Sequence, residues 1–60
     1  MRRFEVRYRH RLTDEIRLEE IDAFGFEEAV SKAYKFRVTQ LGSLWDWEIE
    51  HIQISLKHSV

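Results

Sequence analysis

Apolar and charged residues alternate along the first part of the chain. The even positions from 4 to 12 are mostly apolar: Phe4, Val6, Tyr8, His10 and Leu12. Every odd position from 3 to 11 is charged, and four of these five positions hold arginine. A period of two is typical of a strand with one buried face and one solvated face. The pattern therefore predicts a strand over residues 3–12.

A second alternating segment, residues 16–23, follows polar turn residues at 13–15. Its apolar positions change parity at the step from Glu19 to Glu20. An extra residue in an otherwise alternating strand is typical of a β-bulge. With a bulge there, Leu12 pairs with Ile16 and all the apolar side chains lie on one face of the sheet. We therefore expect an antiparallel hairpin with a bulged second strand.

Residues 26–41 have the spacing of an amphipathic helix, with one broad apolar arc. Gly25 is the expected N-cap and Gly42 the expected stop signal. Arg37 falls inside the apolar arc. Either its charged end reaches solvent along the aliphatic stem, or the last helical turn loosens.

The last segment, residues 44–57, is the longest strand candidate. Its apolar parity changes near Glu50, which indicates a bulge. Pairing it antiparallel to the first strand sets Tyr8 opposite Ile49 and Val6 opposite Ile52. On the solvated face, the same alignment sets each arginine beside an acid: Arg11 with Asp46, Arg9 with Glu48, and Arg7 with Glu50. The apolar and ionic patterns agree on one register.

These elements predict a single α+β domain over residues 1–60, with ββαβ order. The expected sheet is antiparallel with three strands in the order 2-1-3, and the helix covers one of its faces. In the alternative topology the last strand lies beside the second. Like charges would then face each other on the solvated face, which disfavours that arrangement.

Charge is segregated along a chain of 60 residues whose formal net charge is −1. Residues 1–11 carry five Arg and one Glu, whereas residues 12–30 carry seven acids and one Arg. The sequence has no Cys, which excludes disulfides and thiolate metal sites. It has no visible secretory signal and no apolar run long enough to span a membrane, so we expect a cytoplasmic protein.

The arginine row is a candidate nucleic-acid surface, because basic side chains bind phosphates. The candidate residues are Arg3, Arg7, Arg9 and Arg11. The competing interpretation is a lattice of ion pairs across the solvated face, and we favour it because acids flank the row on both sides. On the second strand, the expected partners are Glu19 or Glu20 for Arg9, and Asp22 for Arg7.

The last strand provides the candidate protein-binding residues. Trp45 and Trp47 point the same way, and they either fill the core or form an interface. Past the expected bulge the strand is an edge without Pro, guarded weakly by Gln53, Ser55 and Lys57. An edge of this kind favours strand addition by a second copy or by a partner.

No catalytic, metal or cofactor site is predicted. His10 and His51 do not converge on the expected register, and His58 lies near the end of the chain. Structural metal sites need about four converging ligands. The glycines form no phosphate loop, and no nucleophile–base spacing is present. We therefore expect a non-enzymatic protein.

Residues 23–29, Ala-Phe-Gly-Phe-Glu-Glu-Ala, resemble the helix entry of small ββαβ proteins, including some encoded by phages and mobile elements. The likeness belongs to no single family, and it implies a small inhibitor or adaptor. The sequence thus favours a protein-interaction module, self-associating as a homodimer through its last strand. Nucleic-acid binding through the arginine row is the alternative.

Overall fold

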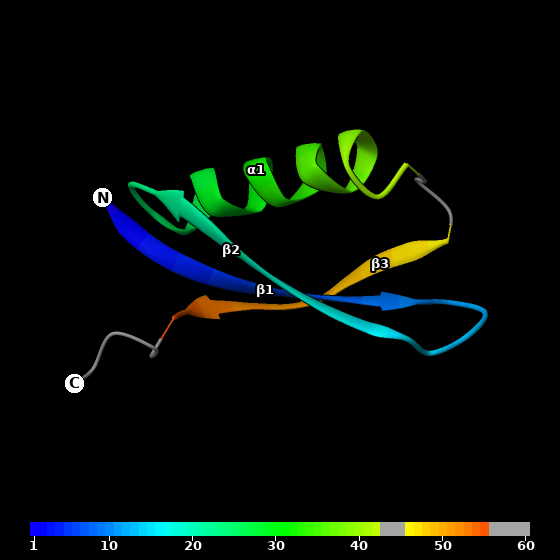
Figure 1. The fold of residues 1–60 in the computed structure, drawn as a ribbon. Helices are drawn as coiled ribbons and strands as arrows, with labels where there is room; N and C mark the ends of the chain where they lie inside the picture. The colour runs from blue at the N-terminus through cyan, green and yellow to red at the C-terminus, as the bar shows by residue number, and fades with distance from the viewer. Residues whose placement is uncertain (43–45, 56–60) are drawn as a thin grey trace.

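The structure is a computed structural model and describes residues 1–42 and 46–55. Its elements follow in the order β1 (Arg2–His10), β2 (Ile16–Ala23), α1 (Phe26–Thr39) and β3 (Trp47–Ile54). The strands form one antiparallel sheet in the order β2-β1-β3. The helix lies over one face of this sheet, and no other described element covers the opposite face (Figure 1). The predicted α+β class, element order and strand order are confirmed.

The core lies between α1 and the central strand. The even residues of β1, Phe4, Val6 and Tyr8, are buried under the helix. Ala29 and Ala33 are the buried helix residues, and their small side chains let α1 approach the sheet closely. The Tyr8 hydroxyl donates a hydrogen bond of 2.8 Å to the carbonyl of Ala33. This bond fixes the middle of the helix to the central strand.

The register between β1 and β3 matches the sequence prediction. Tyr8 pairs with Ile49 and Val6 with Ile52, and the register shifts between Arg7 and Tyr8. The shift leaves Glu50 as the extra residue of the bulge. The predicted partner of Leu12, Trp45, lies outside the described residues.

The predicted register between β1 and β2 is wrong. Val6 pairs with Glu19 and Phe4 with Ile21, in one continuous ladder without a bulge. The cause is the connecting loop. His10 pairs with Glu15 through its backbone N–H at 2.8 Å, so the loop spans residues 11–14 and not 13–15. Asp14 adopts a left-handed backbone with φ 61°, which Asp tolerates better than most residues.

The continuous ladder changes which face β2 presents. Ile21 and Ala23 are buried under the helix, as expected. Ile16 and Leu18 lie on the other face, where their exposed fractions are 47% and 49%. The alternation of a strand makes this unavoidable once the bulge is absent.

The helix ends at Thr39, slightly before the predicted end near Leu41. Gln40 is the C-cap, and the N–H groups of Gln40 and Leu41 both point to the carbonyl of Phe36. Gly42 has φ 71°, a left-handed backbone that favours glycine after a helix. At the other end, Gly25 is the N-cap, and the Glu28 carboxylate accepts a hydrogen bond of 2.6 Å from the N–H of Phe24.

Candidate functional site

The sheet has two free edges, and the backbone pattern of β1 defines which peptide groups face them. The N–H of Ser55 donates to the carbonyl of Arg3, and the N–H of Arg11 donates to the carbonyl of Asp46. In antiparallel pairs, hydrogen bonding alternates from residue to residue. The odd residues of β1 therefore bond to β3, and the even residues bond to β2. It follows that every second peptide group of each outer strand points away from the sheet.

On β3, the peptide groups that point outward past the bulge belong to Ile52 and Ile54. We call this segment the β3 edge. The side chains of both residues project on the helix side, and Ile54 is 47% exposed. Phe4 is the cross-strand partner of Ile54, and its ring makes an edge contact with Phe26 at 6.4 Å between centroids. An added strand would thus find an apolar flank beside the β3 edge.

Two cations of the helix each cover one outward carbonyl, one on β3 and one on β2. Nη1 of Arg37 donates to the carbonyl of Trp47 at 3.4 Å. Nζ of Lys32 donates to the carbonyl of Asp22 at 2.7 Å. The alternation places both carbonyls on the outward side of their strands. The helix therefore blocks strand addition at one end of β3 and at one end of β2.

These contacts explain why Arg37 interrupts the apolar arc of the helix. Its stem is half-buried, and its guanidinium lies 4.9 Å from the centre of the Tyr34 ring. The Nε atom of Arg37 is buried without a hydrogen-bond partner among the described residues.

The environment of Tyr8 raises the pKa of its hydroxyl to about 12. Burial is the main cause; the charge of Glu19 adds to the rise, and the charge of Arg37 opposes it.

The residues predicted to bind a partner occupy different environments. Trp47 is half-buried, packs against the core and makes an edge contact with His10 at 4.9 Å between ring centroids. Gln53 and Ser55 lie on the face away from the helix and bond back across the sheet. Gln53 donates to Glu5 at 3.3 Å, and Ser55 donates to Glu20 at 3.0 Å. Trp45 and Lys57 lie outside the described residues.

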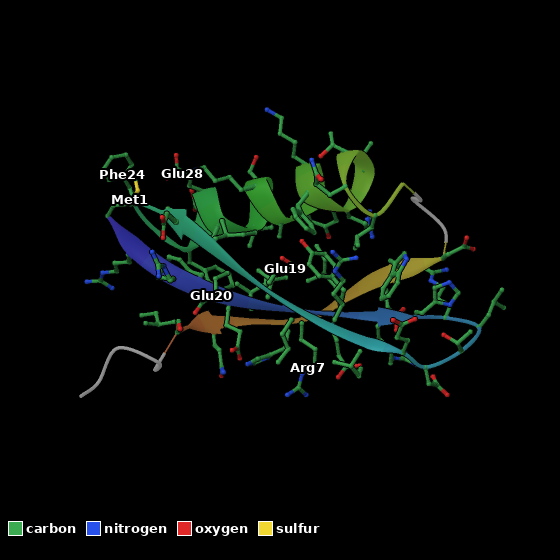
Figure 2. The ribbon with its side chains drawn as sticks, in the orientation of Figure 1. Met1, Arg7, Glu19, Glu20, Phe24 and Glu28 are labelled. Carbon is green, nitrogen blue, oxygen red and sulfur yellow. The ribbon has the colours of Figure 1, made fainter. Side chains whose placement is uncertain are left out.

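We call the sheet face away from α1 the open face. It carries the arginine row, and Figure 2 shows Arg7 projecting on this side. Arg7 pairs with Glu50 at 3.5 Å, and Arg11 pairs with Glu48 at 3.6 Å. These β3 partners are consistent with the predicted ion-pair lattice.

Arg9 has three carboxylate partners on the open face. It binds Asp14 at 2.9 Å, Glu50 at 3.0 Å and also Glu48. The hydrogen bond to Asp14 and the charge of Glu48 raise the pKa of Arg9. Arg9 therefore links the turn, the central strand and β3.

The ion pairs predicted with β2 are wrong for Arg7 and Arg9. Arg7 lies opposite Leu18 and Arg9 opposite Ile16, because the ladder is continuous. Arg3 takes the expected acids instead. It binds Asp22 at 3.0 Å and approaches Glu20 at 4.0 Å. The hydrogen bond to Asp22 raises the pKa of Arg3.

Sequence reasoning missed two groups of exposed apolar residues. Ile16 and Leu18 were expected in the core. The signal for their exposure was the change in apolar parity at Glu19 and Glu20, which puts them on the opposite face from Ile21 when the strand has no bulge. Phe24 and Phe26 flank the helix entry with exposed fractions of 74% and 56%. Phe26 belongs to the apolar arc of the helix in the sequence, so its exposure was not expected, and no prediction was made for the side chain of Phe24.

Among residues 1–42 and 46–55, no three metal-binding side chains converge. Within the same residues, no helix has the length and apolarity that a membrane span requires. No family model, no curated protein and no solved structure matches this chain. The functional argument therefore depends on the geometry of its surfaces.

Proposed function

We propose that this chain is a small non-enzymatic protein-interaction module of the inhibitor or adaptor type, which forms a homodimer through the β3 edge. The observation that carries the proposal is the outward direction of the Ile52 and Ile54 peptide groups on a strand that has no neighbour on that side among the described residues. Strand addition at an open edge gives affinity through main-chain hydrogen bonds. Two copies would share one continuous six-stranded sheet.

The charge distribution of β3 suits antiparallel pairing with itself. Its acids, Glu48 and Glu50, lie in the first half of the strand, and the polar Gln53 lies in the second half. Antiparallel pairing around Ile52 sets Glu50 of one copy opposite Ile54 of the other. The acids of the two copies are then kept apart, which avoids like-charge repulsion.

The small core gives a second reason to expect association. The buried hydrophobic residues among those described number seven, and three of them are alanine: Phe4, Val6, Tyr8, Ile21, Ala23, Ala29 and Ala33. Domains near this size bury only about 60% of the surface of the unfolded chain, so many are stabilised by oligomerisation. A shared β3 ladder would cover Ile54 and extend the apolar layer beside Phe26.

The test uses a backbone substitution at the β3 edge. Ile54→Pro removes an N–H that points away from β1, so it blocks strand addition and spares the β1–β3 ladder. Ile54→Thr is the matched control, because it keeps the N–H and suits a strand. Light scattering after size exclusion should give twice the 7.4 kDa chain mass for the wild type and for Ile54→Thr. It should give the single mass for Ile54→Pro, with an unchanged circular dichroism spectrum.

A monomeric wild type at micromolar concentration, or a dimeric Ile54→Pro protein, would contradict the proposal. Nucleic-acid binding stays the alternative hypothesis. It has less support, because Arg3, Arg7, Arg9 and Arg11 all have carboxylate partners on the open face. That alternative predicts a gel shift at low salt that weakens steeply with added salt and weakens in Arg7→Ala or Arg9→Ala.

A further inference from the structure

The β2 edge is a second open edge, and its chemistry differs from that of β3. Ile16, Leu18 and Glu20 pair with Arg9, Arg7 and Glu5, the β1 residues that bond to β3. Their own peptide groups therefore point away from the sheet. The bond from Lys32 to the carbonyl of Asp22 closes the edge after Glu20. The β2 edge thus offers a short ladder between Ile16 and Glu20.

The open-face side chains of this segment form an ordered series. Ile16 and Leu18 come first, each about half exposed, and Glu20 follows. The two aliphatic side chains are next to each other on one face of the strand, so they form a small continuous apolar surface. A strand paired with the β2 edge would place its own alternate side chains directly beside this series.

Two carboxylates face each other at the end of the series. Glu20 lies directly opposite Glu5, in a pair that is not hydrogen-bonded through the backbone, and side chains are closest in such pairs. Neutral groups donate hydrogen bonds to both carboxylates. The Gln53 amide donates to Glu5, and the Ser55 hydroxyl donates to Glu20. Glu20 also forms an ion pair with Arg3, whose Nη1 lies 4.0 Å from Oε1 of Glu20. Within the part of the chain that the structure describes, no cation lies within ion-pair distance of Glu5. Figure 2 labels Glu20 on β2.

We propose that the β2 edge binds an extended segment of another protein, with aliphatic residues at two alternate positions and Lys or Arg at the next. Its main chain pairs with β2 from Ile16 to Glu20. Its aliphatic side chains cover Ile16 and Leu18, and its cation reaches the carboxylates of Glu20 and Glu5. The cation reduces the repulsion between the two facing carboxylates, and the aliphatic side chains pack against Ile16 and Leu18.

A second copy of this chain fits the β2 edge poorly. Antiparallel pairing of β2 with itself around Leu18 would set Glu20 against Ile16 of the other copy, which provides no cation. The open face of β3 presents Glu48, Glu50 and His51, which are not aliphatic. Charge complementarity therefore favours a different, basic protein segment. With both edges occupied, the module would connect two copies and two partner segments.

The test measures fluorescence anisotropy of labelled heptapeptides with the full chain. One probe peptide contains Val-Thr-Leu-Thr-Lys, and the other contains the same residues in reverse order. The two orders test parallel and antiparallel pairing of the peptide with β2. The control peptide has Glu in place of Lys. We expect saturable binding of a Lys peptide below about 1 mM, and affinity at least about tenfold weaker for the Glu peptide.

Two variants on the β2 edge test the site, and each has a matched control on the helix. Leu18→Ser and Glu20→Lys should each weaken binding of the Lys peptide by about tenfold or more. Val38→Ser and Glu27→Lys change exposed helix residues in the same way and should bind like the wild type. The inference would be overturned if Leu18→Ser and Glu20→Lys bound the Lys peptide as tightly as the wild type does. It would also be overturned if the Glu peptide bound as tightly as the Lys peptide, or if neither Lys peptide bound.

The Ile54→Pro protein separates this inference from the proposed dimer. It should lose self-association and still bind the Lys peptide, because the two edges lie on opposite sides of β1. Loss of peptide binding in Ile54→Pro would place the peptide at the β3 edge and overturn the assignment to β2. A monomeric wild type that binds the Lys peptide would refute the dimer alone.

Discussion

Replacing Tyr8 by phenylalanine should change how the stability of the protein depends on alkaline pH. Tyr8 is fully buried, and its hydroxyl donates to the carbonyl of Ala33 at 2.8 Å. The ionised phenolate cannot donate this bond, and it would have to lose its hydration in the core. Burial, which disfavours the charged phenolate, is the main cause that raises the pKa of Tyr8 to about 12, and the charge of Glu19 adds to the rise.

The sign of the effect follows from proton linkage. An unfolded tyrosine ionises near pH 10, whereas Tyr8 in the folded chain ionises near pH 12. Between these values the folded state binds more protons than the unfolded state, so stability falls as pH rises. A difference of two pKa units corresponds to roughly 3 kcal/mol. The stabilisation is complete below about pH 10 and is lost by about pH 12.

Tyr8→Phe reverses the order of stability between neutral and alkaline solution. At pH 7 the variant loses one hydrogen bond and should be less stable by about 1 kcal/mol. At about pH 12 the wild type has lost roughly 3 kcal/mol that the variant keeps, so the variant should be more stable by about 2 kcal/mol. Urea unfolding followed by tryptophan fluorescence, at one fixed protein concentration, measures both differences.

Tyr34→Phe is the matched control. Tyr34 is exposed on the helix, and its replacement leaves Tyr8 in place. This variant should therefore follow the wild type through the alkaline range. The reasoning is refuted if Tyr8→Phe loses as much stability between about pH 10 and pH 12 as the wild type does.

Two further predictions concern the open face and the core. Arg9→Ala should destabilise the protein more than Arg7→Ala, because Arg9 binds three carboxylates and Arg7 binds one. Urea unfolding at low salt and at about 1 M salt should show this difference shrinking as salt screens the charges. Ala33→Leu should lower the free energy of unfolding by about 1–3 kcal/mol, because the larger side chain overpacks the contact with Tyr8. A Ser31→Leu control on the exposed side of the helix should have little effect.

The part of the fold that involves β3 could be predicted because two independent patterns agreed. The apolar pairs, such as Val6 with Ile52, and the ionic pairs, such as Arg7 with Glu50, require the same register and the same bulge. A wrong register would bury charged side chains or expose apolar ones. The β3 edge then follows directly from strand order. The positions of the helix cations over both edges could not be predicted, because they depend on how α1 lies on the sheet.

The β2 register failed because a local turn determines it. The Nδ1 atom of His10 accepts hydrogen bonds from the N–H groups of Leu12 and Thr13, at 3.2 and 3.3 Å. These bonds and the left-handed Asp14 support a loop that closes at His10 and Glu15. The hydrophobic pattern predicted a loop over residues 13–15, whereas these contacts place the loop at residues 11–14. The hydrophobic pattern favoured the length that the structure does not adopt.

The parity change in β2 is therefore informative about function. Ile16 and Leu18 each leave about half of their surface exposed, and burying both halves would add roughly 2 kcal/mol of stability, the usual value for one fully buried aliphatic side chain. A chain with so small a core would gain from that burial. The turn instead holds both side chains on the open face, beside a free strand edge and ahead of the facing carboxylates of Glu5 and Glu20. This exposed aliphatic pair, the outward-pointing backbone groups of β2 and the two facing carboxylates are together the surface that the proposed bound segment would cover.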